Sequence, residues 1–254
     1  MNYDVPIAQM LAILLGACRT GAWMVICPPF NTRLIPGPVK ALLSVGLALP
    51  MAPYLTGTLP SLETSALLFS VLMQIFIGVA LGFITMLLFA ALQAAGDLLD
   101  LFGGFTLATA YDPLGFNQSS IFGRFYNLVA MTLLFAGDGH QLILRGFMQS
   151  FRTLPLNVSF SPETFSRLLL SGVGEMFVSA LQIAGPLVCV LFLADVSLGL
   201  LNRVAPALNA FQLGFPVKIF LVVTLAGLAI AALPSVLHTL VERAVTAVIR
   251  LSGG

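Results

Sequence analysis

Residues 66–102 read ALLFSVLMQIFIGVALGFITMLLFAALQAAGDLLDLF and set the fold class of this chain. The stretch contains no proline, and its only charged residues, Asp97 and Asp100, lie in its last turns. A membrane-spanning helix needs about 20 mostly apolar residues. This stretch is longer than one straight crossing requires, so we expect a helix that bends or projects beyond the bilayer.

The composition of the whole chain agrees with a membrane location. Of the 254 residues, 59% are hydrophobic and 8% are charged, whereas a soluble domain averages about 25% charged residues. Eleven Lys and Arg against ten Asp and Glu leave a net charge of +1, which argues against nucleic acid as a partner. Because lipid-exposed backbone must satisfy its own hydrogen bonds, the sequence predicts an all-α, polytopic helical membrane protein.

About six long hydrophobic helices are expected, and prolines 50, 53, 186 and 234 inside them predict kinks. Alternating six spans would put five Lys or Arg on each side of the membrane, whereas an ordinary bundle carries a clear cytoplasmic excess. Either the span count is wrong or the assembled protein does not sit in the bilayer conventionally. The expected spans are residues 7–27, 39–59, 66–102, 124–151, 161–202 and 215–250.

Three ionisable residues within apolar stretches are candidate functional groups: Arg19, Asp138 and His140. Such groups are costly at membrane depth and usually face a protein interior or a water-filled cavity. We expect Arg19 to pair with a carboxylate of another helix or subunit, or with carbonyls at a kink; substrate binding is the alternative. Asp138 and His140 predict either a proton relay or a helix break at an interface, because glycines flank Asp138.

Small residues on the third span form a separate candidate feature. Gly78 and Gly82 are four positions apart, a spacing that lets two helices approach closely. This face either closes the monomer or packs against further subunits.

The segment from Phe105 to Phe122 is long for a helix connection, contains no Lys or Arg, and carries apolar side chains. Irregular backbone at membrane depth is tolerated only where protein buries it or where it lines a cavity. A gate or plug is the functional interpretation, and an ordinary interfacial loop is the alternative. The candidate plug residues are Tyr111, Asp112, Pro113, Leu114, Gly115, Phe116 and Asn117.

Enzymatic function is not expected. Tyr111-Asp112 and Gly137-Asp138 resemble parts of intramembrane aspartyl protease motifs, but Pro113 follows Asp112 in a loop, and Phe135 stands where the second motif has its first glycine. The chain also lacks a Gly-x-Ser-x-Gly elbow. No cysteine pair has zinc-type spacing, so neither a metal nor a cofactor is expected.

Several short motifs, in order and spacing, resemble the FliR family of the flagellar export gate, called SctT in virulence injectisomes. They cover nearly the whole chain, and some, such as Gly139-His140, resemble the flagellar branch more closely. The motifs are RLIP at residues 33–36, QIFIGVALGF at 74–83, TAYDP at 109–113, GRFYN at 123–127, GH at 139–140, SFRTLP at 150–155, GLLNRVAPALN at 199–209 and GFP at 214–216.

The resemblance implies a place in a helical hetero-oligomeric export gate of the bacterial inner membrane, in the flagellar basal body. FliP-like, FliQ-like, FlhB-like and FlhA-like proteins would be its protein partners, membrane lipid would surround it, and unfolded export substrates would enter the pore. Residues 1–151 would be a FliP-like part including the plug loop 105–122, and residues 152–254 a FliQ-like hairpin. An assembly raised toward the periplasm would explain the charge tie. A proton-coupled small-molecule transporter using Arg19, Asp138 and His140 is the alternative.

Overall fold

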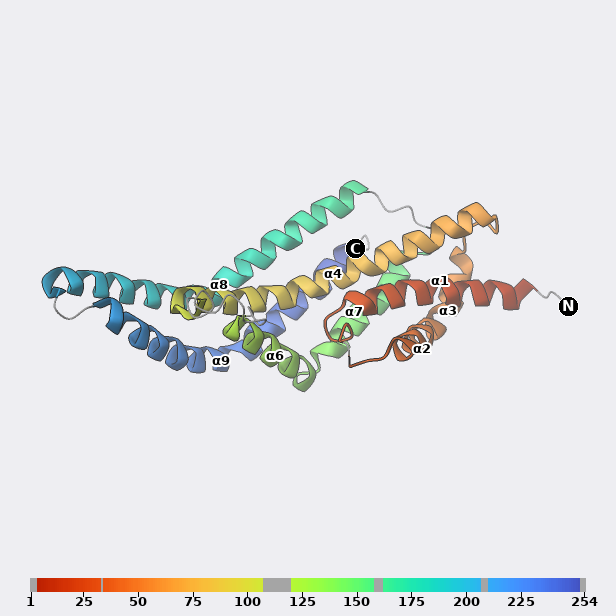
Figure 1. Cartoon of the computed structure of the whole chain (residues 1–254). Helices are drawn as coiled ribbons and strands as arrows, with labels where there is room; N and C mark the ends of the chain where they lie inside the picture. The colour runs from red at the N-terminus through yellow and green to blue at the C-terminus, as the bar shows by residue number, and fades with distance from the viewer. Residues whose placement is uncertain (1–3, 33, 107–119, 158–161, 207–209, 252–254) are drawn as a thin grey trace. The chain divides into compact units, whose positions relative to one another are not determined.

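The computed structural model describes residues 4–32, 34–106, 120–157, 162–206 and 210–251, and every regular element in these ranges is helical. The seven long helices of these ranges are labelled in Figure 1. They are α1 (Asp4–Ile26), α2 (Gly37–Ala48), α4 (Thr64–Gly103), α6 (Ile121–Ala136), α7 (Gly139–Thr153), α8 (Pro162–Val204) and α9 (Ala210–Leu251). Three short elements, η1 (Leu49–Met51), α3 (Ala52–Leu55) and η2 (Thr56–Thr58), follow α2.

The chain forms two compact units that are interleaved in sequence. Unit 1 comprises Met1–Leu88, Asp138–Val173 and Leu240–Gly254, and unit 2 comprises Phe89–Gly137 and Gly174–Thr239. Helices α4, α8 and α9 each contribute to both units. The predicted division at residue 151 separates a FliP-like part from a FliQ-like part. Compact units are defined by contacts and not by resemblance to other proteins, so they do not test this division, and it stays a prediction.

The core of unit 1 forms around α1, which packs against α2 and α3 (Figure 1). Trp23 of α1 is 1% exposed and stacks on Phe147 of α7, with ring centroids 4.3 Å apart. Leu15 and Leu55 are buried in the same unit. Aromatic stacking of this kind adds to the stabilisation that burial of apolar area supplies.

In unit 2, α4 and α6 supply most of the buried side chains that precede α8. Leu92 and Leu99 of α4 are buried, as are Tyr126 and Leu134 of α6. These positions lie seven or eight residues apart on their helices, which places each pair on one face. The two apolar faces therefore account for the local core of this unit.

Proline placement explains the interrupted second span. Pro36 precedes α2 at its N-cap position, where a missing backbone N–H costs nothing. The helix ends at Ala48, and η1 follows with Pro50 in its first turn; Pro53 has the same place in α3. Pro186, Pro216 and Pro234, by contrast, lie inside α8 and α9.

The predicted span at residues 124–151 is wrong. The structure divides it into α6 and α7, which are separated by Gly137 and Asp138. Asp138 has φ 55°, a left-handed conformation that stops a right-handed helix. A hydropathy average runs across this two-residue turn and therefore misses it.

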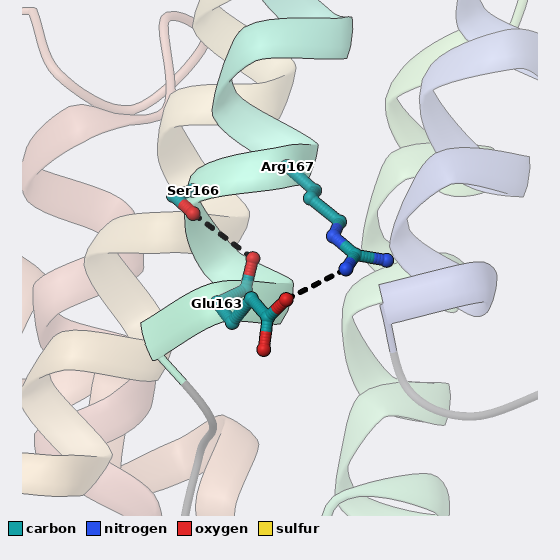
Figure 2. A network of polar contacts seen from close by, with 3 residues as sticks. All are labelled: Glu163, Ser166 and Arg167. Atoms are coloured by element: carbon teal, nitrogen blue, oxygen red, sulfur yellow. Dashed lines mark hydrogen bonds and ion pairs between the residues drawn. The ribbon is translucent and has the colours of Figure 1, made fainter.

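Helix α8 begins at Pro162, one residue after the start of the expected span 161–202, and proline followed by Glu163 suits a helix N-terminus. Figure 2 shows its first turns, in which Arg167 contacts the Glu163 carboxylate at 2.6 Å and Ser166 Oγ donates to the Glu163 carbonyl. Both charged side chains are more than 70% exposed, so the pair contributes little to stability. Its orientation, with the acid nearer the N-terminus, suits the helix dipole.

Five helical segments are long and apolar enough to cross a membrane, judged by length and composition over the described residues. They are Ile7–Ile26, Gly37–Thr58, Thr64–Gly103, Leu169–Val204 and Ala229–Ile249. The prediction of a polytopic helical membrane protein is confirmed. Five segments rather than the expected six meet this criterion, and α6 is one of the shorter apolar helices of the described residues.

Candidate functional site

Arg19 of α1 lies at the centre of a buried polar network in unit 1, with none of its surface exposed. Its Nε donates to Gln74 Oε1 of α4 at 2.7 Å. The two terminal nitrogens donate to the backbone carbonyls of Ser150, at 3.1 Å, and Leu154, at 2.8 Å. One guanidinium therefore joins α1, α4 and the end of α7.

Uncharged oxygens accept these hydrogen bonds. Ser150 lies in the last turn of α7, and Leu154 is the C-cap residue of that helix. Carbonyl groups in the last turn of a helix carry the negative end of the helix dipole, so a cation is favourable there. The Phe151 ring lies 4.6 Å from the guanidinium carbon and adds a cation–π contact. The expected partners of Arg19 were a carboxylate or carbonyls at a kink, and the structure shows carbonyls at the end of α7.

Gln74 and Thr58 extend the network to the segment after α7. Gln74 Nε2 donates to the Leu156 carbonyl at 3.3 Å, and the Leu156 N–H donates to Thr58 Oγ1 at 3.4 Å. Gln74 is fully buried. Residues 154–156 are therefore held on both sides by polar contacts that leave the backbone little freedom.

The glycines of α4 face α1 of the same chain. A Cβ added at Gly78 would lie 2.2 Å from the Arg19 carbonyl oxygen, and one at Gly82 would lie 3.0 Å from Ile26 Cβ. Real Cβ atoms do not approach a backbone oxygen so closely, so the two helices can meet here only because these side chains are absent. Of the two interpretations of this face, the structure realises the intramolecular one.

Asp138 and His140 lie at the turn between α6 and α7. Asp138 is exposed, and its Oδ1 accepts a hydrogen bond from Gln141 Nε2 at 3.0 Å, while His140 is partly exposed in the first turn of α7. The geometry is that of a helix break rather than of a relay within a continuous span. Arg19 and Asp138 have different hydrogen-bond partners, so the structure does not join them in one site.

Asp100 of α4 lies where the candidate plug segment ends, in unit 2. Its Oδ2 accepts hydrogen bonds from the Ser120 hydroxyl and from the Phe122 N–H, the latter at 2.9 Å. Ser120 is the N-cap of α6 and also accepts from the Gly123 N–H at 2.7 Å. An acid at a helix N-terminus satisfies free N–H groups and suits the dipole.

Two further contacts fix the same region. The rings of Phe105 and Phe122 meet edge to face, 5.4 Å apart. A Cβ at Gly96 would lie 2.4 Å from the Phe122 carbonyl, so α4 and α6 approach as closely as backbones allow. The predicted plug residues 111–117 themselves lie outside the described residues, but the chain on either side of them is held firmly.

Sequence reasoning missed the roles of Gln74 and Asp100. Both are polar residues in the apolar stretch 66–102, and each is now nearly or fully buried with hydrogen-bond partners. A polar side chain inside an apolar helix needs a partner, and that rule could have marked them. Among the described residues, no three His, Cys, Asp or Glu side chains gather as a metal site would require.

Comparison with known proteins places the chain in a family. The model of the family described as "Bacterial export proteins, family 1" matches residues 10–244. The chain belongs to this family. The resemblance on which the motif analysis rested is therefore confirmed over nearly the whole length.

Members of the family from flagellar and virulence systems are similar to this chain. The flagellar biosynthetic protein FliR of Pectobacterium carotovorum subsp. carotovorum is 36% identical over 230 residues, 90% of this chain and 84% of that protein. FliR of Bacillus subtilis strain 168 is 32% identical over 215 residues, 82% of each chain. The Yop proteins translocation protein T of Yersinia pestis is 29% identical over 226 residues, 86% of this chain and 85% of that protein.

These relatives and the apolar helices settle the general role of this family member. It is a membrane-embedded subunit of a type III export apparatus. The Arg19 network and the Asp100 contacts are thus features of an export protein.

Proposed function

We propose that this chain is the FliR-type subunit of a flagellar export gate in the bacterial inner membrane, and that its role is mechanical rather than catalytic. With FliP-like and FliQ-like subunits it forms the entry pore for unfolded export substrates, beside FlhB-like and FlhA-like proteins. Similarity to flagellar FliR proteins of several bacteria supports the flagellar assignment. The assembly is raised toward the periplasm, which accounts for the balanced Lys and Arg count.

Residues 111–117 close this pore as a plug, with Tyr111, Leu114 and Phe116 as its apolar part. The observation that carries this proposal is the pair of anchors at the ends of the segment. Asp100 binds Ser120 and Phe122 at the start of α6, and Phe105 packs on Phe122. These contacts hold together the two described ends of the 13-residue stretch between positions 106 and 120.

Ion leak across the inner membrane tests the plug. The chain is expressed with its FliP-like and FliQ-like partners, either intact or with Tyr111–Asn117 replaced by seven Gly and Ser residues. We expect the replacement to make cells leak ions and grow poorly, and only when the partners are present. The matched control replaces Asn31 and Thr32, in another loop, with glycine and serine.

A leak without the partners would show a pore that this chain forms alone, which contradicts the shared gate. A complex that assembles normally and stays tight with the Gly-Ser segment would refute the plug. The transporter alternative gains no support, because Arg19 and Asp138 have different partners and Asp138 lies in an exposed turn.

A further inference from the structure

Helix α7 exposes a polar stripe on the surface of unit 1. Its exposed residues are all polar, and intervals of four, four and three positions place them in one line along the helix. Ile143, Phe147 and Phe151 are buried. The stripe consists of Gln141, Arg145, Gln149 and Arg152.

This stripe lies beside a candidate membrane span and not beyond its ends. The Phe151 ring comes within 3.8 Å of the position that a Cβ at Gly16 would take. Gly16 is near the middle of the candidate span Ile7–Ile26, so Arg152, the residue after Phe151, lies close to the same level. Helix α7 itself is neither among the five candidate spans nor among the shorter apolar helices of the described residues.

Helix α9 extends the polar surface within unit 1. A Cβ added at Gly146 of α7 would lie 3.2 Å from Val245 Cγ1 of α9, so the two helices meet there. Val241 and Ala244 of α9 are buried. Between positions 240 and 249 the exposed residues are Glu242, Arg243 and Thr246. Together with the stripe of α7 they form a surface that we call the α7–α9 face.

Helix α2, which also packs on α1, has the opposite pattern. Between positions 41 and 49 no exposed residue is polar, and Leu42 is 73% exposed. The hydroxyl of Ser44 is turned inward and donates to the Lys40 carbonyl at 2.7 Å. Apolar residues outside and polar residues inside are usual for a membrane helix. Unit 1 therefore has one surface that suits hydrocarbon and another that does not.

The charges of the α7–α9 face restrict what can lie against it. Arg152 lies over the exposed Tyr54 ring at 5.2 Å, and neither Arg152 nor Arg145 forms an ion pair with another described residue. Neither hydrocarbon nor an apolar protein surface solvates a guanidinium, and charged groups at membrane depth ordinarily face a water-filled cavity. Water therefore has to lie beside this face.

We propose that the α7–α9 face is a wall of a water-filled passage and binds acidic segments of the unfolded polypeptide in transit. Three arginines and one glutamate make the face cationic. Guanidinium groups donate paired hydrogen bonds to carboxylates, which an unfolded chain leaves exposed. Each solvated ion pair is weak, so the chain is guided without being held. The inference rests on the proposed function and names substrate contacts outside the plug 111–117.

The first measurement asks whether water lies at Gln149. The full chain, in complex with its FliP-like and FliQ-like partners in lipid nanodiscs, carries a nitroxide at Gln149→Cys. Cys18→Ala and Cys189→Ala remove the other accessible thiols, and Cys27 is buried. Power-saturation EPR compares collisions with oxygen, which concentrates in hydrocarbon, and with a water-soluble nickel chelate. We expect the chelate to dominate at position 149 and oxygen to dominate at the matched control, Leu43→Cys of α2.

The second measurement is export of two reporters in cells. They share one unfolded sequence, in which the acidic residues of the first are replaced by Asn and Gln in the second. With Arg145→Gln and Arg152→Gln combined, export of the acidic reporter should fall by about threefold to tenfold, as loss of two exposed ion pairs predicts. Export of the neutral reporter should not change. Arg167→Gln is the matched control, because Glu163 already pairs with that charge.

Four results would overturn the proposal. Oxygen dominating at position 149 would put lipid against the face, and few collisions with either reagent would put another subunit there. Equal export of the two reporters by the double variant would exclude the contact with acidic segments, while normal export by the wild-type chain would leave the proposed function intact. If the wild-type chain exports neither reporter, the proposed function itself fails, and the α7–α9 assignment fails with it.

Discussion

Replacing Arg19 with methionine removes the guanidinium that joins α1, α4 and α7 while keeping a long unbranched side chain. Three acceptors are affected. The Ser150 carbonyl still accepts from the Leu154 N–H at 2.9 Å, but Gln74 Oε1 and the Leu154 carbonyl lose the donors that Arg19 supplies. Both groups lie in the buried network of unit 1.

A buried acceptor left without a donor costs about 1–3 kcal/mol, and no buried charge remains because the hydrogen-bond partners of Arg19 are neutral. Two abandoned acceptors and the lost contact with Phe151 lead us to expect destabilisation of about 2–6 kcal/mol for Arg19→Met. Arg19→Lys keeps the charge but not the fork of donors, so it should recover only part of this loss.

The single tryptophan of the chain provides the assay. Trp23 is buried one turn from Arg19 and stacks on Phe147, so its emission reports on this region. Unfolding of the full chain in mixed micelles, followed by Trp23 fluorescence, gives the free energy of unfolding. The matched control is Arg152→Met, because Arg152 is exposed and contacts the Tyr54 ring at 5.2 Å; we expect a change below about 1 kcal/mol there.

A double-mutant cycle with Gln74→Leu completes the test. If Arg19 and Gln74 depend on one another, the double variant should be more stable than the sum of the single losses predicts, by about 1 kcal/mol or more. Equal effects of Arg19→Met and Arg152→Met, or additive losses in the cycle, would refute the conclusion that Arg19 is held by this network.

Three further predictions concern other contacts. Gly78→Ala should destabilise unit 1, since the new Cβ would clash with the Arg19 carbonyl oxygen. Gly46→Ala, in open space, should stabilise α2 by about 0.5–1 kcal/mol. Thermal unfolding compares the two variants, and equal melting temperatures would contradict the close approach of α1 and α4. Asp100→Ala should cost about 2–4 kcal/mol because Ser120 and Phe122 lose their acceptor. Glu175→Ala, at an exposed position of unit 2, should be nearly neutral, and limited proteolysis near residue 120 distinguishes the two variants. Asp195 of α8 and Lys218 of α9 form an ion pair at 2.5 Å in unit 2. Asp195→Lys and Lys218→Asp should each lower thermal stability, and the double variant, with the charges exchanged, should recover it. A double variant that recovers no stability would show that the ion pair contributes nothing.

The local sequence was enough to predict the positions of most helices. The proline-free stretch 66–102 predicts α4 within two residues at each end. The expected span 161–202 begins within one residue of the start of α8. The exception is the fourth span, because Gly137 and Asp138 form a turn too short to lower a hydropathy average over about 20 residues. The glycines on either side of Asp138 are the local signal, and they favour the helix break, one of the two interpretations given for this stretch.

The candidate site was less predictable. Arg19 could be identified as a rare charge in an apolar stretch, and Gly78 and Gly82 as small residues at helix-packing spacing. Neither pattern predicts which residues they contact. Gln74 is 55 positions from Arg19, and Ser150 is 131 positions away. Contacts over such separations depend on how helices pack, which periodicity along one helix does not encode.

Composition and hydropathy were sufficient to predict the fold class. A chain with 8% charged residues has too few of them for a water-exposed surface, and in lipid the backbone N–H and C=O groups must form their hydrogen bonds within helices. Ordered short motifs sufficed for the family. The folded structure was needed to show that helix-end carbonyls hold Arg19 and that Asp100 caps α6. Each of these depends on which helix faces meet, and buried hydrogen bonds form wherever packing brings a donor to an acceptor, however far apart the two lie in sequence.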